Sequence, residues 1–273
     1  MVVEKAYAKL NLTLSILGKR TDGFHELESI MVPICDLFDE LTFEENDSYE
    51  FVVIDNCIEN NSILKAAKAF QEKYKTKGAN IRLNKRIPLE AGLAGGSADS
   101  SATLRGLNKL FNLNIPLIEL EELASSLGSD NVFTLYNKAA ICRGRGEKLE
   151  FIDSKFEFNI SLIKPTFGLL TKDVFSKLNL NETNGGNQKL VLKALEENNY
   201  KLLEANLFND LLKPALLIEP RLSEMIDFVE SFGVRCFMSG SGTTLYYFGK
   251  IDINLASDIY NQSHLIKNDV KDC

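Results

Sequence analysis

The chain has 273 residues, of which 45% are hydrophobic and 25% are charged, and its formal net charge is -7. These values are ordinary for a soluble protein large enough for two domains, and the negative charge argues against a nucleic-acid-binding surface. The sequence contains no run of 18 apolar residues and no signal-peptide pattern, so we expect a cytoplasmic protein without a membrane segment. The chain contains only 2 histidines, which excludes a histidine-rich metal centre.

Near the N-terminus, residues 8–16 alternate apolar and polar side chains, which predicts a β-strand. Lys9 and Asn11 fall on its polar side and therefore project together. From the alternation alone, such a side is more often a solvated face than a catalytic one.

The cysteines are Cys35, Cys57, Cys142, Cys236 and Cys273, an odd and scattered set. None has the C-x-x-C spacing of a zinc or redox site. This pattern predicts reduced thiols rather than a disulfide framework.

Residues 88–101 read Pro-Leu-Glu-Ala-Gly-Leu-Ala-Gly-Gly-Ser-Ala-Asp-Ser-Ser, between a predicted strand at residues 79–85 and a predicted helix at residues 97–110. Glycines here let the backbone approach an anion, while the first N–H groups of the helix face it. The stretch therefore indicates a loop that binds the phosphates of a nucleoside triphosphate. A connector whose glycines serve only turn geometry is the alternative.

This loop differs from two familiar nucleotide motifs. It lacks the lysine of G-x-x-x-x-G-K-[ST], and the spacing of Gly92, Gly95 and Gly96 does not fit G-x-G-x-x-G. Ser97 is the expected N-cap of the following helix, and its hydroxyl could reach Mg²⁺ or a phosphate oxygen.

The remaining sequence predicts an α+β architecture in two domains, residues 1–152 and 153–273. Further helices are expected at residues 62–74, 117–127, 171–178, 188–197, 200–213 and 221–232, a strand at 156–163, and paired strands around 239–242. Asp130 is expected at the start of another helix, where an aspartate is usually only a cap.

Several segments, taken in order, resemble the GHMP small-molecule kinases. They are residues 6–12, Gly23-Phe24-His25, the glycine-rich loop, Gly128-Ser129-Asp130, Gly144-Arg145-Gly146-Glu147 and Met238-Ser239-Gly240-Ser241-Gly242. The resemblance implies a nucleotide-binding domain like one in ribosomal protein S5, followed by a ferredoxin-like domain. It also implies an active site in the cleft between them, with the Ser239 segment folded beside the glycine-rich loop.

The resemblance implies ATP- and Mg²⁺-dependent phosphorylation of a small alcohol, with no obligate protein partner evident. The Lys9-x-Asn11, Gly23-Phe24-His25 and Asn209-Asp210-Leu211 segments are most similar to members that act on a cytidine diphosphate-linked polyol in non-mevalonate isoprenoid synthesis. Catalysis then falls to Asp130 as general base, with Lys9 beside it, because a positive charge within about 4–6 Å keeps a carboxylate ionised.

The resemblance also assigns binding residues. For ATP they are Pro88, Leu89, Glu90, Ala91, Gly92, Leu93, Ala94, Gly95, Gly96, Ser97 and Ala98, with Asn61 and Lys85 beside the adenosine, and Ser97 is the candidate Mg²⁺ ligand. For the substrate they are Phe24 and Phe175, whose rings flank the cytosine, His25, which bonds the base, and Asn11 and Thr171 near the polyol. Taken alone, such phenylalanines are more often core residues and such a histidine is more often structural.

The chain departs from the family pattern after Asp130. Relatives usually read Asp-Val-Pro-Phe-Phe, whereas this chain has Asp130-Asn131-Val132-Phe133-Thr134, and Asn137-Lys138 replaces a common glycine pair. Ala94 also stands where many relatives carry glycine. Two alternatives stay open: a GHMP kinase of the homoserine or mevalonate type, and a sensor of the same fold that binds a metabolite without turnover.

Overall fold

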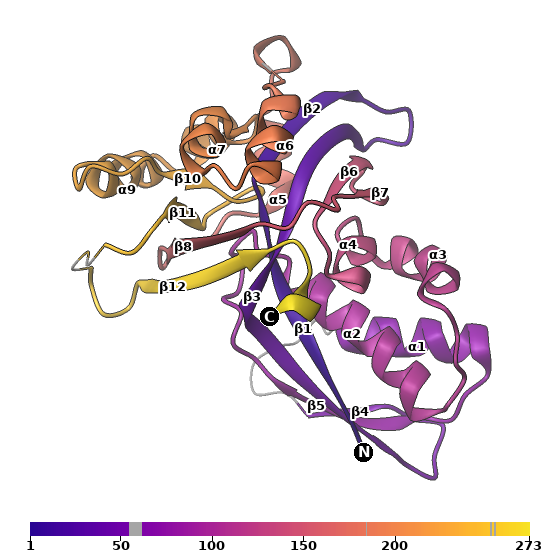
Figure 1. Cartoon of the computed structure of the whole chain (residues 1–273). Helices are drawn as coiled ribbons and strands as arrows, with labels where there is room; N and C mark the ends of the chain where they lie inside the picture. The colour runs from indigo at the N-terminus through magenta and orange to yellow at the C-terminus, as the bar shows by residue number, and fades with distance from the viewer. Residues whose placement is uncertain (55–61, 184, 252, 254) are drawn as a thin grey trace. The chain divides into compact units, whose positions relative to one another are not determined.

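The computed structural model describes the chain except at residues 55–61, 184, 252 and 254, which Figure 1 draws in grey. The chain forms two compact units. Unit 1 comprises Met1–Ala8, Leu37–Ile87 and Ala94–Asn137, and unit 2 comprises Lys9–Asp36, Pro88–Leu93 and Lys138–Cys273. The units interleave along the sequence because β1 (Val2–Asn11) and β3 (His25–Glu45) each contribute residues to both. The family-domain boundary near residue 152 stays a prediction.

Unit 1 packs helices against a small sheet. Strand β5 (Ala79–Asn84) pairs antiparallel with the end of β3 and parallel with β4 (Val52–Ile54). The helices are α1 (Ser62–Tyr74), α2 (Gly95–Leu110), α3 (Leu117–Leu127) and α4 (Asn131–Tyr136). Helix α2 contacts the other three (Figure 1).

Helix α2 lies directly on the sheet because Gly106 has no side chain. A Cβ added at Gly106 would come within 2.3 Å of the Phe43 ring, which belongs to β3. Close approach buries one side of the helix from Ala98 to Leu110. The helix is therefore held in place by packing along its buried side, and this packing also positions its first turn.

Unit 2 contains a larger sheet in the order β10-β11-β8-β12-β3-β2-β9, with β6 paired to β3 and β7 paired to β6. The strands are β2 (Thr13–Lys19), β6 (Ala140–Gly144), β7 (Lys148–Phe151), β8 (Glu157–Lys164), β9 (Phe208–Asn209), β10 (Phe237–Met238), β11 (Leu245–Phe248) and β12 (Tyr260–Lys267). Neighbours run antiparallel except β2 and β9, which run parallel.

Helices cover this sheet and enclose an apolar core. They are α5 (Thr171–Ser176), α6 (Gln188–Glu196), α7 (Tyr200–Asn206), α8 (Leu212–Ile218) and α9 (Arg221–Glu230), with short turns η1 (Leu180–Glu182) and η2 (Val270–Asp272). The core joins strand residues such as Leu14, Ile163 and Tyr247 to helix residues such as Leu222 and Val229. No helix in the described part of the chain is long and apolar enough to cross a bilayer.

Two predicted elements are wrong in form. The single helix over residues 200–213 is interrupted after α7, because Asp210 is held by β2: its Oδ2 accepts from Ile16 N at 2.8 Å, and its own N–H donates to Leu14 O at 2.9 Å. The strand over residues 8–16 is divided between β1 and β2.

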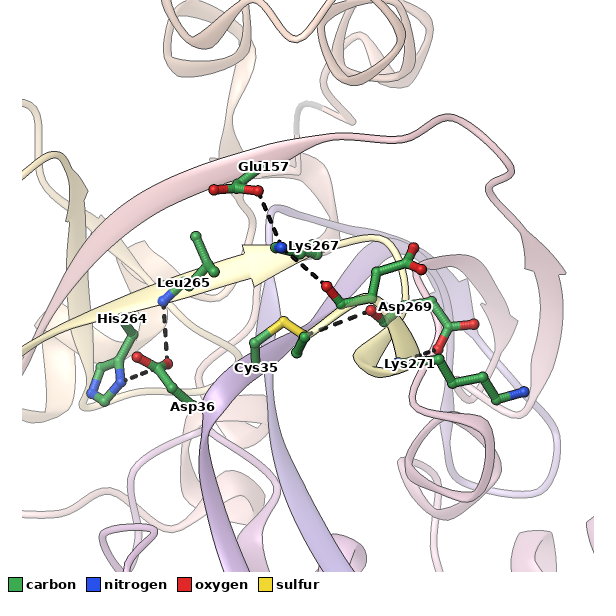
Figure 2. The surroundings of a disulfide bond; sticks show 10 residues. Cys35, Asp36, Glu157, His264, Leu265, Lys267, Asp269 and Lys271 are labelled. Atoms are coloured by element: carbon green, nitrogen blue, oxygen red, sulfur yellow. Dashed lines mark hydrogen bonds and ion pairs between the residues drawn. A yellow bond between two sulfur atoms is a disulfide. The ribbon is translucent and has the colours of Figure 1, made fainter.

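The predicted cysteine chemistry is also wrong for one pair. Cys35 on β3 and Cys273 form a disulfide whose Cα atoms are 5.8 Å apart (Figure 2). Their sequence separation is 238, so the disulfide depends on contacts between distant segments, such as the pairing of β12 with β3. Cysteine spacing cannot reveal such contacts. Cys142 and Cys236 are buried, and Cys57 lies outside the described residues.

Candidate functional site

The glycine-rich loop leads into α2, which begins at Gly95, so Ser97 lies inside its first turn. The residue before the helix, Ala94, has a left-handed φ of 58°, and no described side chain caps this end. The prediction that Ser97 is the N-cap is therefore wrong. The first backbone bond of the turn runs from Ala98 N to Ala94 O. The earlier N–H groups thus precede the helical ladder and lie at the positive end of the helix dipole.

Gly96 leaves this first turn open. Gly96 is exposed, and the nearest atom to a Cβ added there is the Ser62 Oγ, at 3.8 Å. A phosphate could approach the N–H groups without meeting a side chain. This is the geometry that the phosphate-loop prediction requires, and the nucleotide role itself stays a prediction.

Lys85, predicted to lie beside the adenosine, is bonded to two buried carboxylates. Its Nζ donates to Asp39 Oδ2 and, at 2.9 Å, to Asp99 Oδ2. Burial opposes the charge of Lys85, but the two carboxylates outweigh it and raise the lysine pKa. Burial also disfavours the charged form of Asp99 and raises its pKa to about 7, although the positive charge of Lys85 acts in the opposite direction. Asn61, the other adenosine candidate, lies outside the described residues.

Asp130 immediately precedes α4, as predicted, and its side chain does not cap that helix. Helix α4 is fastened to α2 by hydroxyl groups: Ser101 Oγ donates to Asn131 O at 2.7 Å, and Thr134 Oγ1 donates to Ser101 Oγ at 2.9 Å. Arg105 Nη1 also donates to Thr134 O at 2.8 Å. Thr134 departs from the family pattern, but its hydroxyl contributes to holding the helix that Asp130 precedes.

In unit 2, Lys9 and Asn11 are buried, each 3% exposed, so the solvated-face alternative is wrong. Lys9 Nζ donates to Asn11 Oδ1, and Asn11 Nδ2 donates to Ser29 Oγ at 2.8 Å. Because Asn11 is held by Ser29, it can orient the lysine ammonium. Lys9 belongs to unit 2 and Asp130 to unit 1, so their pairing stays a prediction.

The turn over residues 239–242 lies against the glycine-rich loop, as the resemblance implies. A Cβ added at Gly92 would come within 2.4 Å of Ser239 O, and Ser239 Oγ donates to Gly92 O at 3.2 Å. Thr171, a predicted substrate residue, reaches the same turn through a contact of 2.9 Å between its Oγ1 and Ser241 Oγ.

Asn209, part of a segment that carried the resemblance, has a structural position. Its Nδ2 donates to Met238 O at 2.9 Å and to Gly240 O at 2.8 Å. Asn209 therefore fixes the backbone of the turn over residues 239–242.

The predicted aromatic residues form two separate pairs. The rings of His25 and Phe175 stack with centroids 5.0 Å apart, while the Arg145 guanidinium lies 4.7 Å from the centre of the Phe24 ring. Partial burial, helped by the charge of Lys19, lowers the pKa of His25, which favours a neutral imidazole. Arg145 was not among the predicted site residues. The sequence signal that could have pointed to Arg145 was the segment Gly144-Arg145-Gly146-Glu147, which is one of the segments that carry the family resemblance.

The described residues contain no group of three or more His, Cys, Asp or Glu side chains that could hold a metal ion. Mg²⁺ commonly keeps several waters and binds through substrate phosphates with only one or two protein ligands. A magnesium ion held mainly by nucleotide phosphates would need no such group of protein ligands. Ser97 stays the candidate ligand.

Two family models match the chain. The model described as GHMP kinases N terminal domain matches residues 61–138, and the model described as GHMP kinases C terminal matches residues 191–259. Two proteins of Staphylococcus aureus, from strains bovine RF122 / ET3-1 and MRSA252, are provisionally named 4-diphosphocytidyl-2-C-methyl-D-erythritol kinase. Each is 39% identical over 280 residues, which cover 99% of this chain and 98% of the relative.

Solved structures are similar over nearly the same length. A crystal structure of 4-(cytidine 5'-diphospho)-2C-methyl-D-erythritol kinase has a TM-score of 0.82 and 27% identity, covering 97% of this chain and 99% of its own. Homoserine kinase from Cytophaga hutchinsonii has a TM-score of 0.65 at 15% identity, covering 98% and 96%. Mevalonate kinase of L. major has a TM-score of 0.67 at 14% identity, covering 97% and 96%. The last two show a shared fold alone.

Proposed function

The chain belongs to the GHMP kinase family and has its two-domain α+β fold, and we propose that it phosphorylates 4-diphosphocytidyl-2-C-methyl-D-erythritol at the 2-hydroxyl with ATP. The observation that carries this proposal is the 39% identity, over 99% of the chain, to relatives provisionally named for that kinase activity. The reaction would take place in the cytoplasm as a step of non-mevalonate isoprenoid synthesis.

The proposed reaction is a direct transfer. The substrate 2-hydroxyl oxygen attacks the γ-phosphorus of ATP in line with the departing oxygen, and Asp130 accepts the hydroxyl proton. The bond between the γ-phosphorus and the bridging oxygen breaks, and ADP leaves. No covalent enzyme intermediate is needed.

Lys9 serves as the electrostatic partner in this proposal. Its positive charge would polarise the hydroxyl group of the substrate. Its position is supported by Asn11, which accepts from the ammonium, and by Ser29, which holds Asn11. This two-step support fixes the lysine direction, as a catalytic group requires.

The nucleotide phosphates would bind at the first turn of α2. Gly96 is open there, and the N–H groups before Ala98 precede the helical bonds. Mg²⁺, with Ser97 as a candidate ligand, supplies charge neutralisation for the phosphates when bound.

The substrate base would enter between aromatic side chains. The stacked pair of His25 and Phe175 supplies one ring face, and Phe24, under Arg145, supplies another. Cytosine could replace one of these contacts and stack in its place. Asn11 and Thr171 are proposed near the polyol.

A turnover assay with alternative substrates tests this proposal. The purified protein is given ATP, Mg²⁺ and one alcohol at a time: the diphosphocytidyl substrate, homoserine or mevalonate. We expect ADP release and a phosphorylated product only with the first. Turnover with another alcohol would replace the proposed substrate, and nucleotide binding without turnover on any of them would favour the sensor.

A further inference from the structure

The two ends of the glycine-rich loop are tied to one buried cluster of ionisable side chains: Asp39, Lys85 and Asp99. Asp39 and Asp99 are 0% and 2% exposed, and the Lys85 side chain is 11% exposed. Ions removed from water this far are costly unless each is paired and hydrogen-bonded. The cluster therefore constrains the backbone to which its members are attached.

The entry to the loop is held by Asp39. Its Oδ1 accepts from Arg86 N at 2.5 Å and from Ile87 N at 2.8 Å, the last residues before Pro88. Its Oδ2 accepts from Lys85 Nζ. A single carboxylate thus fixes both the backbone that enters the loop and the lysine next to it.

The exit from the loop is held by the same lysine. Lys85 Nζ donates at 2.9 Å to Asp99 Oδ2, which lies in the first turns of α2. The ammonium also passes close under the helix start, because a Cβ added at Gly95 would lie 2.9 Å from Nζ and 3.2 Å from the Ile87 Cγ2. Glycine at this position lets the helix begin directly over the cluster.

We infer that Asp39 and Asp99 are positioning residues for nucleotide binding, acting through Lys85 and the backbone of residues 86–87 to hold the two ends of the phosphate loop. This inference rests on the proposed function only insofar as the loop binds a nucleotide. Neither carboxylate needs to touch the ligand. Their role is to hold the first turns of α2 against the backbone of residues 86–87, so that the first N–H groups of the helix are kept in place for a phosphate group.

The test compares Asp39→Ala with Asp39→Asn. Alanine removes every bond of the carboxylate, whereas asparagine keeps one oxygen for the N–H groups of Arg86 and Ile87 and loses the charge that binds Lys85. Phe70→Leu is the control, because Phe70 is fully buried on α1 and belongs to no predicted site. The readouts are hydrogen exchange of residues 86–99 in the ligand-free protein and the Kd for Mg²⁺ with a non-hydrolysable ATP analogue.

We expect Asp39→Ala and Asp99→Ala to accelerate hydrogen exchange at residues 86–99 and to raise the Kd for the ATP analogue by at least about tenfold. Asp39→Asn should raise this Kd less. Phe70→Leu should lower the melting temperature but keep the Kd within about twofold. A folded Asp39→Ala protein with the parent's Kd, or equal weakening by Phe70→Leu, would overturn the inference. If Asp39→Ala does not fold, Asp39→Asn compared with Phe70→Leu decides in the same way.

This design separates the inference from the proposed reaction. If the parent protein binds the analogue but does not phosphorylate the diphosphocytidyl substrate, the proposed function is wrong. The Kd values of the variants then still test the inference. A parent protein that binds no nucleotide overturns both.

Discussion

Gly240 lies over the ammonium group of Lys9: a Cβ added at Gly240 would be 3.3 Å from Lys9 Nζ and 3.4 Å from Asn11 Oδ1. The same Cβ would be 3.1 Å from Gly92 O. The absence of a side chain at residue 240 therefore leaves room beside Lys9, Asn11 and the glycine-rich loop. A proposed catalytic residue and a backbone turn thus share one small space.

Gly240→Ala should consequently reduce kcat by about tenfold, since the added methyl group would displace either the ammonium or the loop. The variant also places alanine at a φ of 57°, which costs about 1–2 kcal/mol of stability by itself. Gly233→Ala separates these effects, because Gly233 has a φ of 82° and nothing within 4 Å. Steady-state kinetics of both variants should show lost turnover only in Gly240→Ala. Equal kcat values for Gly240→Ala and Gly233→Ala would contradict the proposal that turnover depends on the space between residue 240 and Lys9.

Asp130→Asn should lower kcat by roughly 10²–10⁴ and leave nucleotide affinity nearly unchanged, as expected for loss of a general base. Lys9→Ala should behave similarly. Asp153→Asn is a control, because Asp153 is exposed and pairs with Lys138. Single-turnover rates and nucleotide titration check these expectations. Turnover near that of the parent in both Asp130→Asn and Lys9→Ala would place the chemistry elsewhere.

Phe175→Ala should raise KM for the diphosphocytidyl substrate by about 5- to 150-fold, since base stacking on an aromatic ring contributes about 1–3 kcal/mol. Stacking tolerates any base, so preference for cytosine must come from hydrogen bonds, with His25 as the candidate. Free CMP should therefore inhibit more strongly than UMP, and His25→Ala should reduce the difference. Equal inhibition by CMP and UMP in the parent would favour another GHMP substrate.

Periodicity predicted the local elements of this chain well. The helices at Ser62–Tyr74 and Leu117–Leu127 have the predicted bounds, and the strand at Ala79–Asn84 ends one residue early. In each, apolar spacing agrees with the face that is buried. The glycine-rich loop was likewise predicted between a strand and a helix, because glycines and apolar spacing are local signals.

Contacts between distant residues could not be predicted in this way. Alternation around Lys9 suggested a solvated face, but Asn11 finds Ser29, 18 residues away, and a buried polar layer results. Lys85 meets Asp39, 46 residues earlier, and no local pattern marks either as a partner. The helix over residues 200–213 was overruled for the same reason, because Asp210 bonds to Ile16.

Reduction of the Cys35–Cys273 disulfide should destabilise the protein by about 2–4 kcal/mol, because the bond closes a long loop and restricts the unfolded chain. Thermal unfolding with and without a reductant measures the effect. Cys273→Ser is the internal control: its melting temperature should be as low as that of the reduced parent and should not respond to reductant. A parent that melts at the same temperature in both conditions would show that the bond does not contribute.

Asp99 should make stability depend on pH. Burial raises its pKa from 3.8 to about 7, while Lys85 opposes the shift and Asp39 adds to it. Between these two values the folded protein holds a proton that the unfolded chain has released, so the Asp99 contribution to stability is lost as pH rises from about 4 to 7. Because the pKa of Asp99 is higher in the folded protein than in the unfolded chain, this loss of stability is complete above about pH 7. Asp99→Asn removes this titration. Between pH 5 and 8 the free energy of unfolding should decrease in both proteins, and the decrease should be larger in the parent than in Asp99→Asn by more than about 1 kcal/mol. Denaturant unfolding at several pH values measures both proteins, and parallel curves would mean that Asp99 ionises in the folded state as it does in the unfolded chain.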